Sequence, residues 1–393
     1  MTNKFSLRIA ACISIALLLL NTITACSKVK TVTDYPVNET VSASEDEGKK
    51  NVFSIKEDEN EEPDFTKFNN AEPFNEDGEF VYDPTALRPG LDSVLANDNL
   101  SLLLAKEILK TISEGGDTFE MNLETNIPQV IFDRAYKLAC VSNPIAYIAE
   151  FQTDDYRTFT ISYPDYFDQI NEEGIYEYTG KVHDMADEMP GFEYFITNTI
   201  NDNVFADDTE TEKARKIYKF MIEKYSILDD YSNVEIDPES NMGTEHNDVL
   251  KHYETDALYR NEFIMLYRFF LTQMNIQSVY SVCIADCQVD HIKELFYESQ
   301  FVSPDELGVQ FLEFIYIFTD GNTYICNPYY ESLEYRYDQS RGHDKGCECK
   351  FFGLSRKTFD ETANTDGGFA VPGDYEDFNN AFPEPEEDYI IPE

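Results

Sequence analysis

Tryptophan is absent from the 393-residue chain, and basic residues are few. Thirty lysines and arginines stand against 76 aspartates and glutamates, so the formal net charge is −46. The chain therefore lacks the basic face that neutralises phosphates, and we expect neither a nucleic-acid partner nor peripheral binding to anionic lipid. It also lacks the Asp/Asn ladder with a central Gly and a terminal Glu that typifies an EF-hand. The sequence predicts no cofactor and no metal.

Long apolar runs are missing except near the start of the chain. Residues 9–20 are apolar and follow Lys4 and Arg8, but this run is too short to span a membrane comfortably. The small residues before Cys26 indicate a cleavage site. The pattern resembles the lipobox of bacterial lipoproteins. That resemblance implies a signal peptide over residues 1–25, acylation of Cys26, and a protein exported and lipid-anchored to the outer face of the bacterial cell membrane. An uncleaved membrane anchor is the alternative.

Sustained hydrophobic periodicity is absent from both ends of the mature chain. Residues 26–91 are rich in Glu, Asp, Asn, Thr and Ser with scattered single Phe residues, and residues 363–393 are similarly acidic. Such segments bury too little apolar area to offset chain entropy. We expect an acidic disordered tether and an acidic disordered tail. A segment that folds on a partner is the alternative for the tether.

Periodic segments begin near residue 92. The leucines and isoleucines of residues 100–112 share one face of a predicted helix, and Gly115-Gly116 ends that helix. A second helix is expected from about Pro128 to Asn143-Pro144, and residues 157–163 alternate like a half-buried strand. We expect a small helical/β subdomain over residues 92–204.

A second group of elements follows in residues 205–362. Thr209 and Glu212 form a capping box before a helix that runs to Tyr225. A polar loop over residues 229–255 leads to a nearly all-apolar helix. That helix occupies residues 263–274, with a strand at 278–282 and a hairpin formed by residues 311–318 and 323–328.

This order resembles the core of the transglutaminase-like, papain-like fold. The resemblance implies an α+β fold in which a buried helix packs on an antiparallel sheet, and in which a segment like residues 349–355 forms a closing strand. In that family a Cys at the start of the helix, a His on the next strand and an Asp after the hairpin form the catalytic triad. Counted from Asn275 and from the Asp320-Gly321 turn, these positions fall on Arg260, Leu312 and Asn327.

The resemblance thus implies the scaffold without its chemistry, because none of these three residues can replace a Cys or a His. The missing tryptophan removes two further marks of the family. We expect no catalytic residue, and a domain that binds a peptide, glycan or protein partner at the envelope. An active cysteine amidase, peptidase or transglutaminase with a relocated nucleophile, Cys326 or Cys283, is the alternative; a structural spacer is a third reading.

The remaining residues with reactive side chains have several readings. In an exported protein disulfides are the default, for example between Cys283 and Cys287 or between Cys326 and Cys347; free thiols are the alternative. A zinc site is another reading for a larger set: Cys283, Cys287, His291, His343, Cys347 and Cys349. Three further histidines are expected at the surface: His183, His246 and His252. Six aromatic residues could line a sugar-stacking groove but are expected mainly in the core: Tyr329, Tyr330, Tyr335, Tyr337, Phe351 and Phe352.

Overall fold

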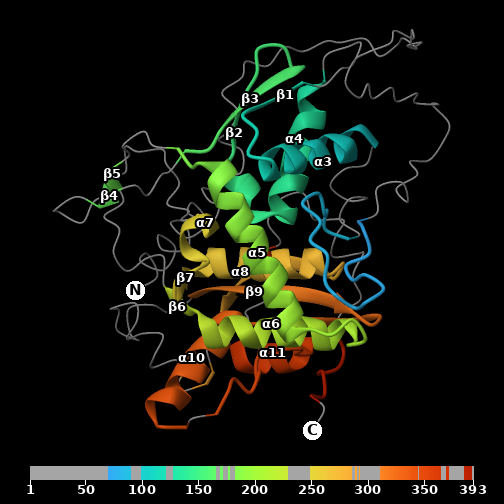
Figure 1. The fold of residues 1–393 in the computed structure, drawn as a ribbon. Helices are drawn as coiled ribbons and strands as arrows, with labels where there is room; N and C mark the ends of the chain where they lie inside the picture. Colours follow the sequence, from blue (N-terminus) through green and yellow to red (C-terminus); the bar gives the residue numbers. More distant parts are fainter. Residues whose placement is uncertain are drawn as a thin grey trace.

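The computed structural model of the chain is a mixed α+β fold with antiparallel sheets, as expected from the sequence (Figure 1). It describes these residues: 70–89, 99–120, 127–164, 169–170, 176–177, 182–228, 248–285, 288–289, 292, 310–343, 345–363, 369–370 and 385–391. Cys26, His246, Cys287 and His291, together with the expected signal peptide, lie outside this part of the chain.

The first group of elements contains two α-helices, a short 3-10 helix and a three-stranded sheet. Helix α3 ends before Gly115, whose φ of +67° a side chain would strain, and helix α4 ends before Asn143, as predicted. Asn143 then caps a short 3-10 helix by accepting from the Ile145 amide. The bounds of these elements are α3 Asn99–Ser113, β1 Thr118–Glu120, α4 Gln129–Ser142, η2 Pro144–Ile148, β2 Glu150–Gln152 and β3 Thr158–Ser162; the strands form a sheet in the order β1-β3-β2.

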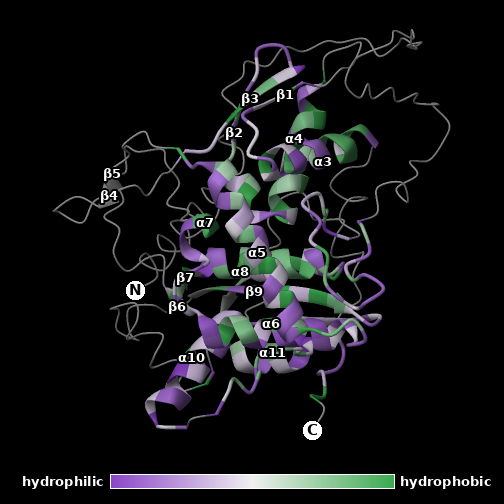
Figure 2. Ribbon diagram, in the orientation of Figure 1, coloured by the Kyte–Doolittle hydropathy of each residue, from purple (hydrophilic) through white to green (hydrophobic). Residues whose placement is uncertain are grey.

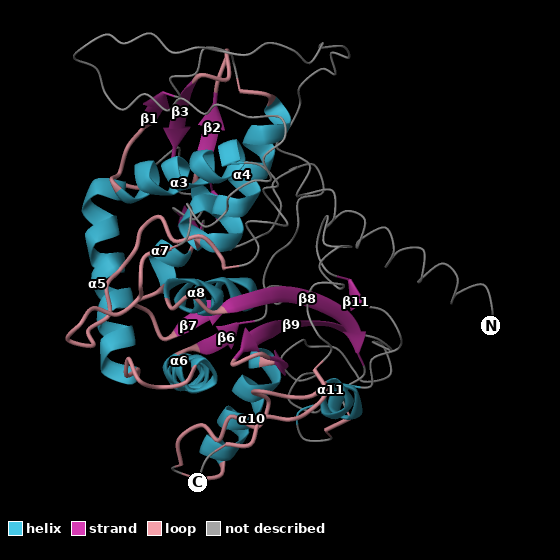
Figure 3. Ribbon diagram, turned by 90° about the vertical axis from the view of Figure 1, so that its right-hand side faces the viewer, coloured by secondary structure: helices cyan, strands magenta, loops and turns pink. Residues whose placement is uncertain are grey.

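Helix α5, Met185–Asn203, connects this upper part to the lower part of the molecule (Figures 1 and 3). The two-residue strands β4 (Gln169–Ile170) and β5 (Tyr176–Glu177) pair just before it. The next helix, α6 (Glu210–Lys224), begins with the predicted capping box: Thr209 and Glu212 each accept the other's backbone amide. Purple, hydrophilic residues recur along α6 and α10 in Figure 2, whereas green predominates in α4.

The buried helix is α8, Arg260–Gln273, which begins three residues before the expected run. Twelve of its fourteen residues are buried, and Phe263, Tyr267 and Phe270 have no exposed surface. Burying each such side chain stabilises the fold by roughly 1.5–3 kcal/mol. Asn275, with a φ of +59°, ends the helix. Three short elements precede α8 in the chain: β6 (Ser226–Leu228), α7 (Val249–His252) and β7 (Ala257–Tyr259). The end of the expected loop, residues 229–255, therefore contains helix α7.

The main sheet has the order β10-β9-β8-β11 and is antiparallel. The predicted hairpin turns at Asp320-Gly321, both with positive φ. Helix α8 lies on one side of the strands and α11 on the other (Figure 3). The bounds are β8 Gln277–Ala285, β9 Gln310–Thr319, β10 Asn322–Cys326, α10 Pro328–Ser340, α11 Arg356–Ala363 and β11 Phe369–Ala370. Buried residues of the upper and lower parts form one continuous hydrophobic cluster.

The expected tether is wrong for residues 70–89, which pack against the domain. Phe80 and Leu87 are buried, and Arg88 is only 1% exposed. The Arg88 guanidinium donates to the carbonyls of Val141 and Ser278 and so joins α4 to β8. Isolated apolar residues without a period gave no signal for this segment, because it is built of turns and an isolated bridge between Phe74 and Phe80 rather than of a helix or strand.

The expected tail and closing strand also need correction. Residues 369–370 pair with β8, and residues 385–391 pack beside α11: the Pro385 carbonyl accepts from Arg356, and Asp388 accepts from the Ser355 amide. Residues 349–355 form no strand; only Leu354 bridges to Ile325. Within the described part of the chain, no helix is both long and apolar enough to cross a bilayer.

Candidate functional site

The candidate site lies at the N-terminus of α8, where the resemblance places a nucleophile. Arg260 is the first residue of the helix and is 5% exposed. Its guanidinium carbon stands 4.1 Å from the centre of the Tyr329 ring, a cation–π contact. Its Nε lies 3.9 Å from Glu313 Oε2. Arg260 is thus enclosed by the sheet and by the start of α10.

The strand residue beside Arg260 is Glu313, the neighbour of the predicted Leu312. Glu313 contacts Arg260 and accepts a hydrogen bond of 2.7 Å from the Tyr280 hydroxyl. Because side chains alternate along a strand, Leu312 points to the opposite face, where its pairing partner Cys283 lies near Arg356 of α11. A shift of one residue exchanges the two faces of the sheet.

The third position, Asn327, caps α10. Its Oδ1 accepts from the Tyr330 backbone amide at 3.1 Å, and the backbone amide of Asn327 donates to the Phe351 carbonyl. The side chain is completely buried, and Nδ2 has no hydrogen-bond partner among the described residues. The residue that reaches Arg260 from this segment is Tyr329. The three chain segments meet through Arg260, Glu313 and Tyr329.

Arg260 supplies neither a nucleophile nor a base, because a guanidinium stays protonated and has only donors. Glu313 lies beside Arg260 and accepts from Tyr280. What the arrangement can supply is a fixed array of aromatic, cationic and carboxylate groups.

A second group beside the α8 N-terminus was missed by the sequence reasoning. His183, expected at the surface, is 7% exposed and lies between two carboxylates, at 2.7 Å from Glu188 and 3.0 Å from Asp248. His252 contacts Glu262 at 2.8 Å, and its side chain is 26% exposed. Two histidines in separate polar stretches gave no signal. The one hint was Glu262, a single acid at the third position of an apolar helix.

Burial and ion pairing compete in this histidine–carboxylate group. Burial lowers the pKa of His183, but the hydrogen bonds and charges of Asp248 and Glu188 outweigh it and raise the pKa to about 9. Burial also lowers the pKa of His252, but the hydrogen bond to Glu262 outweighs burial, and the pKa of His252 is raised. Burial raises the pKa of Glu262, although His252 and the Tyr259 amide act against it. His183 is therefore a cation at neutral pH.

Disulfides do not form among the described cysteines. Cys326 and Cys347, one of the expected pairs, are separate thiols; the partner proposed for Cys283 is Cys287, outside the described part. Burial raises the pKa of Cys283 to about 12 and that of Cys326 well above its ordinary value. Both shifts run opposite to the lowered pKa that a relocated nucleophile needs.

The zinc reading finds no support in the described chain. No group of three His, Cys, Asp or Glu residues there could hold a metal ion. Cys347 and Cys349 instead lie beside the buried Glu331 of α10, with their Sγ atoms 3.9 Å apart. Burial raises the pKa of Glu331 to about 7, and the carboxylate accepts from the Cys347 thiol and the Phe351 amide. This carboxylate anchors residues 347–351 to α10.

The six candidate sugar-stacking aromatics are mainly core residues, as expected. Tyr329, Tyr330, Phe351 and Phe352 are buried, and the Tyr330 ring packs edge-on against Phe351. They do not form an exposed platform.

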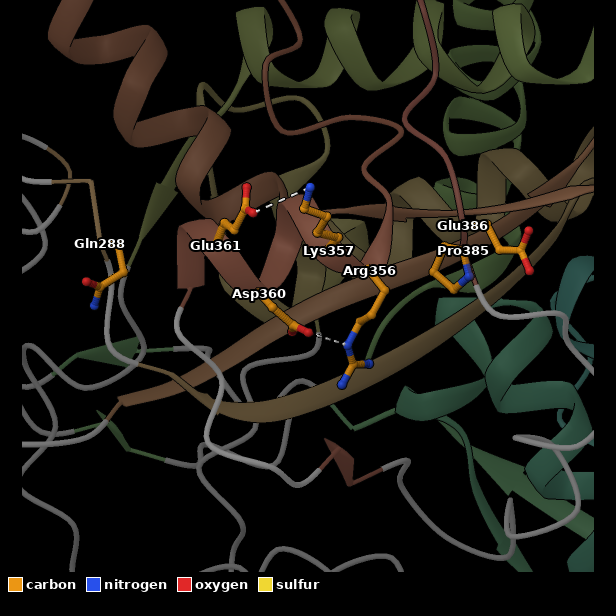
Figure 4. Close-up of a pocket in the computed structure, with 7 residues that line it drawn as sticks. All are labelled: Gln288, Arg356, Lys357, Asp360, Glu361, Pro385 and Glu386. Carbon is orange, nitrogen blue, oxygen red and sulfur yellow. Dashed lines mark hydrogen bonds and ion pairs between the residues drawn. The ribbon is translucent and has the colours of Figure 1, made fainter.

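Two hollows lie outside this site. One of about 840 Å³ lies beside α11 and is lined by paired charges, Arg356 with Asp360 at 3.0 Å and Lys357 with Glu361 at 3.9 Å (Figure 4). It opens on the face of the sheet opposite Arg260. The other, of about 540 Å³, lies beside α6.

Comparison of the chain with models of known protein families and with curated protein sequences finds no match.

Proposed function

We propose that the protein is a non-catalytic, transglutaminase-like binding module of the cell envelope, lipid-anchored through Cys26. Its partner would be a peptide, glycan or protein. One observation supports the proposal: the N-terminus of the buried helix, strand β9 and the segment after the hairpin meet at one place. They present Arg260, Glu313 and Tyr329 in place of a nucleophile, a base and its orienting residue.

Retention of a converging site without a nucleophile favours recognition over catalysis. Arg260 and Tyr329 are buried, at 5% and 2% exposure, and the Glu313 side chain is the most exposed of the three at 19%, so a partner would first contact the carboxylate of Glu313. The two thiols considered as relocated nucleophiles are buried, with raised pKa values.

The scaffold can be tested by restoring the chemistry. In the double variant Arg260→Cys, Glu313→His, the introduced thiol would stand at a helix N-terminus beside an imidazole, both of which lower a thiol pKa. We expect this thiol to react with iodoacetamide much faster at neutral pH than the thiol of Arg260→Cys alone. Equal rates would contradict the assignment of these positions.

The binding role is tested on cells. Wild-type chain, Glu313→Lys and the surface control Glu361→Lys would be compared for capture of envelope peptides and glycans from a defined panel. We expect Glu313→Lys to reduce capture and Glu361→Lys to leave it unchanged. Cysteine-dependent amide cleavage or transfer by the wild-type protein would overturn the proposal, and uniform tolerance of both variants would favour a spacer.

A further inference from the structure

Helix α6 is locally basic, although the molecule as a whole is strongly acidic. The chain as a whole has 76 acidic and 30 basic residues. The fifteen residues of α6 hold five basic residues and three acidic ones. Lys213, Lys216, Phe220 and Lys224 follow one another at intervals of three and four residues, so they lie along one face of the helix.

This face borders the hollow of about 540 Å³. Three lysines line it against two acidic residues, and two phenylalanines supply apolar surface: the lining is Asp202, Asn203, Phe205, Lys216, Lys219, Phe220, Glu223 and Lys224. We call these eight residues the α6 groove. The Phe205 side chain is 64% exposed, although the Lys216 ammonium stands 4.6 Å from its ring centre.

Two lysines of the α6 groove are already ion-paired. Lys216 binds Asp208, which lies outside the groove, at 2.6 Å, with side chains 26% and 12% exposed, and Lys219 lies 3.8 Å from Glu223. The Lys219 side chain is 41% exposed. An exposed pair such as Lys219–Glu223 is worth little in water, so a further carboxylate can share Lys219. At physiological salt the field of distant acidic residues is screened within about 8 Å, and the local charge of the groove decides what binds there.

The sequence contains a matching segment immediately upstream of the described domain. Residues 57–64 hold six carboxylates and no basic residue. The described chain begins at Asn70, and Phe74 lies against α6 itself, with the Lys213 ammonium 4.8 Å from its ring centre. Six extended residues span about 20 Å, and α6 rises about 16 Å from Lys213 to Lys224. The acidic segment can therefore reach the whole α6 groove.

We propose that the α6 groove is a docking site for the chain's own acidic segment, residues 57–64. Attachment through residues 65–69 gives the segment a high effective concentration at the groove, so weak individual ion pairs suffice. An acidic segment of another protein would have to bind without this advantage. The inference concerns a surface separate from the Arg260 site and does not depend on the proposed function.

The test is zero-length carbodiimide cross-linking of the full chain in detergent, mapped by mass spectrometry. We expect links between residues 57–64 and Lys216, Lys219 or Lys224 within one chain, and their loss at high salt. A mixture of isotopically light and heavy chains distinguishes cross-links within one chain from cross-links between two chains. Links between light and heavy chains would overturn the proposal in favour of a second copy, and links to the remote, exposed Lys357 at equal frequency would overturn it outright.

A variant provides the matched measurement. Its substitutions neutralise the segment: Glu57→Gln, Asp58→Asn, Glu59→Gln, Glu61→Gln, Glu62→Gln and Asp64→Asn. We expect the groove lysines to be acetylated several-fold faster in this variant, while Lys357 keeps its rate. The control neutralises an upstream acidic run instead, by Glu45→Gln, Asp46→Asn and Glu47→Gln, and should leave all rates unchanged. Unchanged acetylation of the groove lysines in the first variant would contradict the docking.

Discussion

At the scale of single residues, charged groups gather around the start of α8. Arg260 and Glu313 lie 3.9 Å apart. His183 and His252 lie close by, each fixed by a carboxylate. These groups are partly or wholly out of water, so their interactions are worth more than surface ion pairs.

Removing one member of the Arg260–Glu313 pair should destabilise the fold. Arg260→Met loses the cation–π contact and leaves Glu313 with the Tyr280 hydroxyl but without its cation. We expect a loss of about 1–4 kcal/mol in the free energy of unfolding, measured by urea denaturation. Glu313→Gln alone and the double variant complete a double-mutant cycle. Additive losses would show that the two side chains are not coupled.

His183 should make stability depend on pH. Its pKa is about 9 in the folded protein against 6.5 for the free side chain. A raised histidine pKa stabilises the folded state fully below pH 6.5, and this contribution is lost as the pH rises towards 9. The contribution is of the order of 3 kcal/mol.

The measurement is urea denaturation between pH 6 and pH 9.5 on wild type and His183→Gln. The variant should lose the decline across this window. A proton NMR titration that gives His183 an ordinary pKa would contradict the assignment.

At the scale of elements, the sequence predicted the pieces with a strong local signature. Helix α6 has its capping box, α8 its continuous apolar run, and the β9–β10 hairpin its Asp-Gly turn. Other elements were not predicted: the four-residue α7 and two-residue β11, and also the long helices α5 and α10. Their position follows from contacts distant in sequence, which periodicity does not encode.

The candidate site was predicted only in part, for a related reason. Counting from a turn locates a strand but not its register, so Leu312 and Glu313 could not be distinguished. The pairing of His183 with Asp248 joins residues 65 positions apart, and no local pattern marks it.

The loop of residues 347–351 depends on one buried carboxylate. Glu331→Ala removes the acceptor of the Phe351 and Lys350 amides and of the Cys347 thiol. We expect a loss of about 2–4 kcal/mol, because backbone donors are left unsatisfied in the core. We also expect faster alkylation of Cys347 and Cys349, followed by mass spectrometry. Glu334→Ala, which removes the carboxylate paired with Lys350, is the matched control. Equal effects of the two substitutions would refute the anchoring role.

At the scale of the whole molecule, the domain is larger than composition suggested. Residues 70–89 and 385–391 are acidic or polar on average, yet they place Phe80, Leu87 and Tyr389 against the core. Composition averages over a window and misses single anchoring residues in extended chain.

A chain that starts at residue 92 should therefore be much less stable than one that starts at residue 66. The shorter chain lacks Arg88, leaving the carbonyls of Val141 and Ser278 without their donor, and exposes the surface under Phe80 and Leu87. We expect thermal unfolding at a clearly lower temperature, or failure to fold, for the shorter chain. Equal melting temperatures would show that residues 70–89 contribute no stability.

The net charge predicts a further property of the whole molecule. Forty-six surplus negative charges repel one another in the folded state more than in the expanded chain. Raising sodium chloride from low to physiological concentration should raise the melting temperature by screening this repulsion. A melting temperature that falls with added salt would mean that attractive pairs dominate instead.

The burial of the thiols has a consequence for how the protein would age. All five described cysteines are at most 7% exposed. An oxidant in the surroundings can reach them only during the moments when a molecule opens. The oxidised fraction of a population would then increase with the number of past opening events, even when every molecule has refolded.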